Sequence, residues 1–380
     1  MDNLNIKISR EISKDLAKQT SEIMPSGRIC VCCTSDDLDY AKSVISDISS
    51  FDYDISFIEY PDATVPDDEN IMDIVESDED IRLFVGVGGR VVAELLARAC
   101  AIRESEYIFV ANTPDLYGVA YSLGKVEPFE NSEVKPPHIL YVDENCTQGK
   151  KGYASLVGII LGHAVELFEK EYINRLSGRF DEHKLEDEKA LLYGIISSGD
   201  MSDRKRLLEN EIRLSKCERE EFCSAQRVLA KLIEDMSLVS DRGESSLLAA
   251  VTLIKYFKAV LSVEEANLTL PSDLSEKCRN VSKLVGTDMS EIIKRVEKRT
   301  FHPEWLFVHR EYREDMLKEI KKLESKLPAI IRSAKRFMPD AGYHLSEEYD
   351  SNMLIQAVYN LSPLTDEASI VSVADCLGIS

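Results

Sequence analysis

The sequence is poor in the residues that accompany disorder. It contains 17 glycines and 12 prolines in 380 residues, and it shows no internal repeat or low-complexity segment. Hydrophobic residues account for 44% of the chain, which is typical of an ordered globular protein. At this length we expect two domains, each able to bury a sizeable core.

Basic residues are also scarce. The chain has 46 lysines and arginines against 68 aspartates and glutamates, so its formal net charge is −22. A surface of this charge repels the phosphates of nucleic acids and of anionic lipids. We therefore expect no nucleic acid and no membrane as a partner, and the acidity can equally serve solubility.

A long uncharged apolar run is missing. The most apolar candidate, Ser245–Ser262, carries Lys255 and Lys258, and it predicts a buried helix instead of a membrane span. The N-terminal residues Met1–Lys7 do not follow the pattern of a signal peptide. Nine cysteines, an odd number, are scattered along the chain, as is typical of reduced thiols. Together these features favour a cytoplasmic protein.

Strands and helices alternate in the first part of the sequence. We predict strands at Ile29–Cys33, Ile55–Tyr60, Leu83–Val87, Tyr107–Ala111 and Ile139–Val142. We predict helices near Asp37–Ser49, Asp67–Glu76 and Arg90–Glu104. Continuously apolar strands at this spacing favour a parallel sheet covered on both faces. Residues 1–150 are therefore predicted to form a Rossmann-like α/β domain of the nucleotide-binding kind.

Helical periodicity dominates the rest of the chain. We predict helices at Leu156–Leu176, Glu188–Ile196, Phe222–Leu238, Leu247–Leu261, Ile292–Val296, Met316–Leu327, Glu347–Leu361 and Ser369–Leu377. Breaks are expected at Leu268–Asp273 and Phe337–Tyr343, which contain proline. Residues 151–380 are predicted to form an all-helical domain, with a cleft between it and the α/β domain.

A glycine turn follows the third predicted strand. In Arg82–Arg98 the apolar strand runs through Gly86, Gly88 and Gly89 into a helix. Glycines at such a junction let backbone N–H groups approach a phosphate at the positive end of the helix. A plain tight turn has the same local sequence, so both interpretations stay open.

Ligands of parallel sheets bind beyond the carboxyl ends of the strands. Three segments should therefore meet at one edge of the sheet, namely Thr34–Asp37, Val87–Gly89 and Asn112–Asp115.

The order of these features resembles the superfamily of iron-type alcohol dehydrogenases, dehydroquinate synthases and glycerol-1-phosphate dehydrogenases, and the last of these most closely. The stretch Gly86–Glu94 is similar to the family's glycine motif, with Arg90 in place of a third glycine and Glu94 in place of an aspartate. Tyr107–Tyr121 is similar to the strand and loop that follow, and Ala368–Gly378 looks like the closing helix without its arginines.

The resemblance implies a dehydroquinate synthase-like fold and a nicotinamide cofactor, NAD(P). The cofactor-binding residues that it implies are Gly86, Gly88, Gly89, Arg90 and Thr113. Because Arg90 replaces a glycine, a dinucleotide should bind weakly or in an altered pose, unless the arginine clamps a phosphate.

The resemblance also implies a divalent metal held by one aspartate and two histidines, which polarises the substrate hydroxyl for hydride transfer. In this sequence these positions fall on Tyr117, Arg227 and Arg242, and a further family aspartate falls on His163. No histidine lies between His183 and His302. Arginine offers no lone pair to a cation, so a metal is not expected.

Two arginines at such a site attract a carboxylate or a phosphate. We therefore predict a small-anion site at Arg227, Arg242, Tyr117 and His163. In the alternative interpretation the arginines pair with acidic residues and fill an abandoned pocket.

The two histidines of His302–His309 lie seven residues apart, with Glu304 between them. Two helical turns separate such a pair too far for a tight ligand arrangement. The segment instead predicts a helix opened by Pro303, with Trp305, Leu306 and Val308 packed inward.

Three functional hypotheses follow. The first is a diverged glycerol-1-phosphate dehydrogenase-like protein without the metal-ligand set, which binds a nucleotide or a small phosphorylated anion in the cleft and has little or no dehydrogenase activity. The second is an active, metal-dependent NAD(P)H oxidoreductase acting on a polyol phosphate. The third is a non-catalytic structural or regulatory partner protein. The sequence does not choose NAD over NADP, and it leaves a homo-oligomer open.

Overall fold

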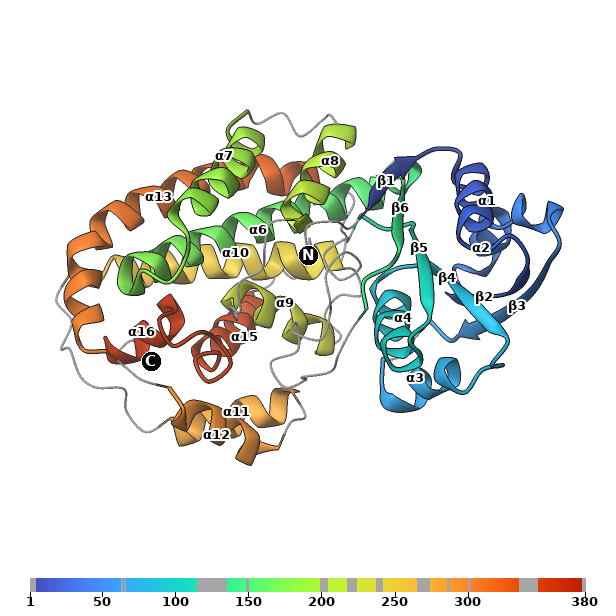
Figure 1. Cartoon of the computed structure of the whole chain (residues 1–380). Coiled ribbons are helices and arrows are strands. Elements are labelled where there is room, and N and C mark those ends of the chain that lie inside the picture. The colour runs from blue at the N-terminus through green and yellow to red at the C-terminus, as the bar shows by residue number, and fades with distance from the viewer. Residues whose placement is uncertain are drawn as a thin grey trace. The chain divides into compact units, whose positions relative to one another are not determined.

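The computed structural model describes residues 5–62, 64, 66–114, 135–147, 150–198, 204–216, 224–236, 242–264, 274–285, 288–299, 302–334 and 348–377. The chain divides into two compact units (Figure 1). The first consists of Met1–Tyr153 and Arg204–Lys216, and the second of Ala154–Asp203 and Cys217–Ser380.

A six-stranded parallel sheet forms the centre of the first unit. Its strands are β1 (Ile6–Ser9), β2 (Gly27–Thr34), β3 (Tyr53–Tyr60), β4 (Ile81–Gly88), β5 (Glu106–Ala111) and β6 (Ile139–Asp143). They lie in the order β1-β6-β5-β4-β2-β3. The predicted parallel sheet and its five strands are confirmed, and β1 is an addition that pairs with β6.

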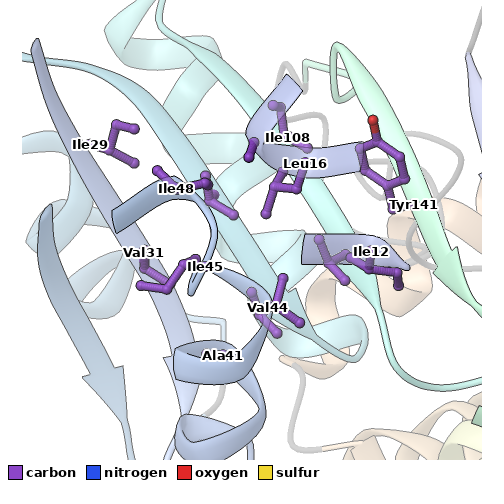
Figure 2. Packing of buried hydrophobic residues seen from close by; sticks show 14 of the residues in the cluster. Ile12, Leu16, Ile29, Val31, Ala41, Val44, Ile45, Ile48, Ile108 and Tyr141 are labelled. Carbon is purple, nitrogen blue, oxygen red and sulfur yellow. The ribbon is translucent and has the colours of Figure 1, made fainter. Parts of the chain in front are cut away.

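Helices cover both faces of this sheet. One face carries α1 (Ile12–Ile23), α2 (Leu38–Val44) and the 3-10 helix η1 (Ile48–Ser50), and the other carries α3 (Asp68–Val75) and α4 (Arg90–Arg103). Figure 2 shows the core under the first face, where Leu16 and Val44 pack on Ile29, Val31 and Tyr141. The 3-10 helix η3 (Glu144–Thr147) follows β6 and contacts α8 (Arg204–Lys216).

The predicted helix over Asp37–Ser49 is shorter than expected. Helix α2 ends at Val44, and η1 begins four residues later. The amide of Asp47 donates to the Ser13 hydroxyl at 3.0 Å. A hydrogen bond from α1 thus satisfies an amide that a continuous helix would have used internally.

The connection from α3 to β4 is held by Arg103 at the end of α4. Its guanidinium donates to five backbone carbonyls, among them those of Val75 at 3.0 Å and Ser77 at 2.8 Å. The same group lies over the ring of Phe84, 5.4 Å from its centroid. Arg103 therefore holds the end of α3 and the connection that follows it against strand β4.

The second unit is helical. Its helices are α6 (Lys150–Ser177), α7 (Glu182–Ser198), α9 (Ala225–Asp235), α10 (Arg242–Leu261), α11 (Ser275–Val285), α12 (Met289–Glu297), α13 (Glu304–Ala334), α15 (Glu348–Tyr359) and α16 (Ile370–Cys376). Every helix predicted in this half is present, and α8 and α11 are additions. The two predicted breaks lie outside the described residues.

Helices α6 and α10 pack in backbone contact. A Cβ placed on Gly158 would lie 2.1 Å from the carbonyl oxygen of Gly243, and one placed on Gly243 would lie 2.2 Å from Cα of Ser155. Only glycine fits at both positions, because backbone atoms cannot move aside as side chains do.

One described helix is long and apolar enough to span a membrane. It is Gly152–Ser177 in α6, with a mean hydropathy of 1.2, and 83% of that window is buried inside its own protein. The buried core helix of a compact unit meets the same test. The segment Ser245–Ser262, predicted to be a buried helix, lies mainly in α10, where Leu248, Ile254 and Phe257 are fully buried.

Candidate functional site

The strand order has a switch point at the carboxyl edge of the sheet. The chain leaves β2 toward β3 and leaves β4 toward β5, on opposite sides of the β2–β4 pair. Such a switch point is where open parallel sheets bind ligands.

The residues that line this switch point are held together by hydrogen bonds. The Asp37 carboxylate accepts a hydrogen bond from the Thr34 hydroxyl at 3.0 Å and one from the Asn112 side-chain amide at 2.5 Å. Thr34 is the last residue of β2, Asp37 and Asn112 follow β2 and β5, and Gly88 of β4 lies against Asp37. The predicted meeting of the three segments is confirmed, except for Asp115, which lies outside the described residues.

Gly88 is the glycine whose conformation this turn requires. Its φ of +135° lies in the region that side chains avoid, and a Cβ there would be 2.5 Å from Oδ2 of Asp37. Gly86, in contrast, lies inside β4, where a Cβ would be 2.4 Å from Leu96. Gly86 thus has a packing role, because α4 approaches the sheet closely at this point.

Helix α4 begins directly after the turn. Gly89 is its N-cap residue and offers no side-chain hydrogen bond to the first turn, and Cγ2 of Thr113 lies 3.7 Å from the Cβ position of Gly89. The first helical residue, Arg90, is half-buried, and its Nε lies 3.8 Å from the buried carboxylate of Glu94. The turn therefore combines a helix N-terminus whose N-cap residue has no side chain with a nearby guanidinium that faces Glu94, and the N-terminal dipole of such a helix favours an anion.

The β2 side of the switch point is acidic. The backbone N–H of Asp36 donates to Asp62 at 2.8 Å, and the Ser35 hydroxyl donates to Glu59 at 2.8 Å. Together with Asp37, these carboxylates favour hydroxyl or amide donors over a second phosphate on that side.

In the helical unit, Arg227 of α9 is engaged by a carboxylate. Its Nε donates to Oε2 of Glu166 at 3.0 Å and its Nη2 donates to Oε1, so the pair is bidentate. Both side chains are largely buried, with exposed fractions of 17% and 7%. This is the pairing that the alternative interpretation of Arg227 predicts.

The other members of the predicted anion site are not placed beside this pair by the described contacts. His163 is half-buried on α6, one turn before Glu166. Arg242 opens α10, but its side chain is not among the described ones, and Tyr117 lies outside the described residues. The anion site therefore stays a prediction.

Arg227 does not fit as a ligand of a divalent metal. Within the described ranges, no three His, Cys, Asp or Glu side chains gather as ligands. A guanidinium donates hydrogen bonds and carries positive charge, so Arg227 cannot replace a histidine ligand.

Three buried glutamates on α6, Glu166, Glu169 and Glu171, were not singled out from the sequence. Glu166 binds Arg227, and Glu169 accepts the Ala225 N–H at 2.8 Å. Burial raises the pKa of Glu169 to about 8. The available signal was a group of charged residues in the second half of a helix whose first half is apolar, and charged residues are rarely buried.

The two histidines of His302–His309 do not converge. The exposed imidazole of His302 lies 3.3 Å from Glu304, whereas His309 is buried and its Nδ1 lies 2.7 Å from the Tyr172 hydroxyl. Helix α13 begins after Pro303, and Trp305 and Leu306 are buried. The predicted helix and its inward packing are therefore confirmed, with Val308 only partly buried.

The sequence matches no protein-family model and no curated protein, whereas solved structures with the same fold are found. A glycerol dehydrogenase from Schizosaccharomyces pombe is 13% identical with a TM-score of 0.51, over 87% of this chain and 92% of that one. A probable glycerol dehydrogenase from Sinorhizobium meliloti 1021 is 14% identical with a TM-score of 0.53, over 84% and 98%. An iron-containing alcohol dehydrogenase from Corynebacterium glutamicum is 12% identical with a TM-score of 0.52, over 99% and 97%.

At these identities the comparison establishes the fold. The chain has the fold of the iron-containing alcohol dehydrogenases, with a parallel-sheet α/β unit followed by a helical one, and the predicted fold class is confirmed.

Proposed function

We propose that the protein is a diverged, glycerol-1-phosphate dehydrogenase-like member of the iron-type alcohol dehydrogenase superfamily that binds a nucleotide, NAD(P), at its glycine turn. The observation that carries this proposal is the turn itself. Gly88 adopts a positive φ at the switch point, directly before Gly89, the N-cap residue of α4. A pyrophosphate at this position is attracted by the first N–H groups of the helix.

The acidic side of the switch point supports the same proposal. Asp37 is fixed by two hydrogen bonds, and a carboxylate held in this way can accept hydrogen bonds from ribose hydroxyls. The pairing of a phosphate-attracting helix end with a hydroxyl-accepting carboxylate suits a nucleotide better than a simple anion.

We further propose that metal-dependent dehydrogenase activity is weak or absent. In the part of the chain that the structure describes, Arg227 is bonded to Glu166 and no ligand set gathers. Elemental analysis of the purified protein is expected to find no stoichiometric iron, zinc or nickel. About one metal per chain, together with polyol phosphate oxidation, would favour the active-enzyme hypothesis instead.

Calorimetric titration with NADH and with NADPH tests the nucleotide site. We expect binding by the wild type and a loss of at least about tenfold in affinity in Gly89→Ala, because the added methyl stands where the phosphate approaches. This variant folds without strain, since its Cβ meets only Thr113 at 3.7 Å. Gly194→Ala on α7, with nothing within 4 Å of the new Cβ, is the matched control.

The titration also decides the role of Arg90. Tighter binding in Arg90→Gly shows that the side chain obstructs the dinucleotide, and weaker binding shows that it clamps a phosphate. No binding of either nucleotide by the wild type contradicts the proposal and favours the structural or regulatory hypothesis.

A further inference from the structure

Strand β3 forms an edge of the sheet without the usual protection. The strand order leaves β1 and β3 as the two outer strands (Figure 1). Proteins commonly protect such edges with short strands, lysine, proline or a bulge, because unpaired N–H and C=O groups can pair with another chain. β1 has four residues, among them Lys7. β3 has eight residues without lysine or proline, and its register with β2 is unbroken. We call residues 51–62, which contain β3, the β3 edge.

The backbone groups on the outer side of β3 have no hydrogen-bond partner among the described residues. The Ser35 N–H donates to the Tyr60 carbonyl at 2.8 Å, so Tyr60 directs its own N–H and C=O toward β2. In a parallel ladder these groups alternate between the two sides of a strand. Ile55, Phe57 and Glu59 therefore direct theirs away from the sheet.

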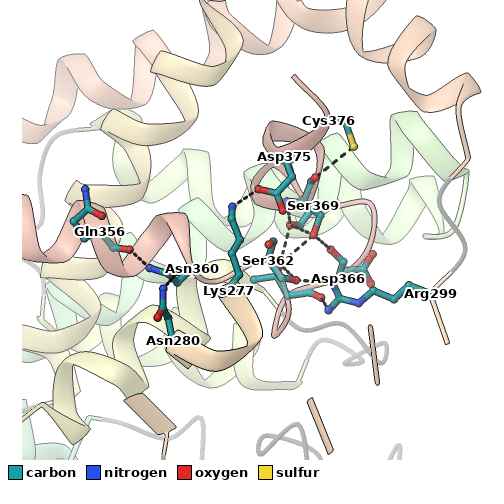
Figure 3. Close-up of polar contacts among 12 residues, drawn as sticks. Lys277, Asn280, Arg299, Gln356, Asn360, Ser362, Asp366, Ser369, Asp375 and Cys376 are labelled. Carbon is teal, nitrogen blue, oxygen red and sulfur yellow. Dashed lines mark hydrogen bonds and ion pairs between the residues drawn. The ribbon is translucent and has the colours of Figure 1, made fainter. Parts of the chain in front are cut away.

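Backbone carbonyls outside the regular ladders are bonded by side chains elsewhere in the protein. Arg299 donates to the carbonyls of Ser362, Pro363 and Thr365 (Figure 3), and Arg103 binds the carbonyls after α3 in the same way. The outer side of β3 depends on solvent instead, so its hydrogen-bonding groups are available to another strand.

Large hydrophobic side chains are exposed along the β3 edge. Phe51 is 46% exposed and Phe57, in the middle of β3, is 39% exposed. The ring centroids of Phe51 and Tyr53 are 6.2 Å apart. Phe57 lies on the same face of the strand as Ile55, which packs against the core under α1 and α2. A strand added at this edge would cover part of the apolar surface and so gain hydrophobic stabilisation besides main-chain hydrogen bonds.

The charge of the β3 edge favours a basic partner. It contains four carboxylate side chains and no lysine, arginine or histidine. The exposed carboxylates are Asp52, Asp54, Glu59 and Asp62. Arg28 of β2 forms an ion pair with Asp54, but it pairs with Asp78 as well, so the edge keeps a negative charge. Lysine or arginine side chains of a partner would be attracted to it.

A second copy of the chain fits the β3 edge less well. Two β3 strands paired antiparallel about a two-fold axis would bring the carboxylates of Asp54 and Glu59 onto neighbouring strands, where like charges are destabilising. Each copy also carries a net charge of −22, which opposes their approach. These features favour a different chain that is extended and basic.

We propose that the β3 edge binds an extended segment of a partner protein in which lysines or arginines alternate with apolar residues. The segment pairs antiparallel with β3, which is the more stable arrangement. Its apolar residues then lie opposite Ile55 and Phe57, and its basic residues lie on the other face, with Asp54. Main-chain hydrogen bonds supply the affinity, and the alternating side chains supply the specificity.

Binding of a synthetic peptide to the full-length protein tests the main-chain pairing. The probe is a blocked, fluorescent peptide of alternating lysine and valine with the eight-residue length of β3, followed by anisotropy at about 0.15 M salt, where distant surface charges are screened. N-methylation of the valines removes the N–H groups that face β3, and it should weaken binding at least about tenfold because several hydrogen bonds are lost. N-methylation of the lysines removes N–H groups on the far side and should leave the affinity nearly unchanged.

Equal affinity of the two methylated peptides shows attraction by net charge alone and overturns the proposal. Absence of binding by the unmethylated peptide overturns it too.

A variant of the edge gives a second, independent test. Phe57→Lys places the residue that protects natural edge strands in the middle of β3, and it should weaken binding of the unmethylated peptide at least about tenfold by repelling the lysines. Phe307→Lys is the matched control, because Phe307 on α13 is 66% exposed and the change in net charge is the same. This control should bind like the wild type, and equal weakening by both variants overturns the proposal.

Sedimentation of the protein without peptide tests the second copy as occupant. We expect no dimer that depends on the β3 edge. A dimer that Phe57→Lys dissociates and Phe307→Lys leaves intact would assign the edge to self-association and overturn the choice of a basic partner.

Discussion

The buried pair of His309 and Tyr172 should make the stability of the helical unit depend on pH. His309 is 4% exposed, and its Nδ1 lies 2.7 Å from the Tyr172 hydroxyl. Burial, and then the charge of Arg313, lower the pKa of His309 from 6.5 to about 4. The neutral imidazole is therefore the form that the folded unit accommodates.

The size of the effect follows from that pKa difference. Between pH 4 and 6.5 the unfolded chain binds a proton that the folded chain does not, so stability falls as the pH falls through this window. A pKa difference of about 2.5, at 1.36 kcal/mol per unit, gives roughly 3 kcal/mol. This is a large fraction of the net stability of a typical domain.

Urea unfolding at pH 7 and at pH 4 measures this loss of stability. Trp305 is the single tryptophan of the chain and lies one turn before His309 on α13, so its fluorescence reports on the helical unit. We expect the wild type to lose roughly 3 kcal/mol more than His309→Gln between the two pH values. The titration of the many carboxyl groups is common to both proteins and cancels. His183→Gln, at an exposed position, should match the wild type.

The pH-independent cost of the substitution does not affect this comparison. Replacing His309 weakens the hydrogen bond of Tyr172 at every pH, so it shifts both unfolding curves alike. If the wild type and His309→Gln lose the same stability between pH 7 and pH 4, the buried imidazole is not held neutral and the reasoning fails.

Three further predictions can be tested with the same preparations. Gly243→Ala should lower the free energy of unfolding by at least about 2 kcal/mol because of the backbone contact between α6 and α10, while Gly194→Ala should not; equal stability would contradict that packing. Arg103→Met should cost roughly 3 kcal/mol through the loss of charge-assisted bonds to carbonyls, and a change below the error of the denaturation curve would rule this role out. Phosphate should raise the melting temperature of the wild type but not that of the Arg227→Gln/Arg242→Gln double variant, and equal stabilisation of both would assign the effect to salt exclusion.

The sequence was a good guide wherever one segment alone decides the structure. The hydrophobic pattern alone identifies long apolar strands such as Leu83–Val87 and strongly periodic helices such as Leu247–Leu261. Strand β1 does not, because it has four residues and only Ser9 is buried. Helix α8 was missed because charged residues fill most of its positions and leave few apolar ones to show the period.

The glycine turn was foreseen for a similar reason. A positive φ and a close approach both demand glycine at position 88, so Gly88 marks the turn without knowledge of the rest of the fold. The partner of Arg227 could not be identified in this way. Glu166 lies 61 residues away and is one of 68 acidic residues, and only the packing of α6 on α9 selects it.

The Glu166–Arg227 pair gives its position a structural reason to hold an arginine. A bidentate pair that is largely buried is sensitive to the loss of one partner, because the remaining charge is left without compensation at a cost of about 3–5 kcal/mol. Where the resemblance places a metal ligand, the chain has a cation that is part of the polypeptide and a carboxylate that neutralises it. Stability alone can therefore retain Arg227, and its presence is not by itself a sign of ligand binding. An anion that binds there has to compete with a carboxylate already in bidentate contact, whereas the proposed nucleotide at the glycine turn would meet a helix N-terminus with glycine at its N-cap. This difference is why the nucleotide site carries the functional proposal.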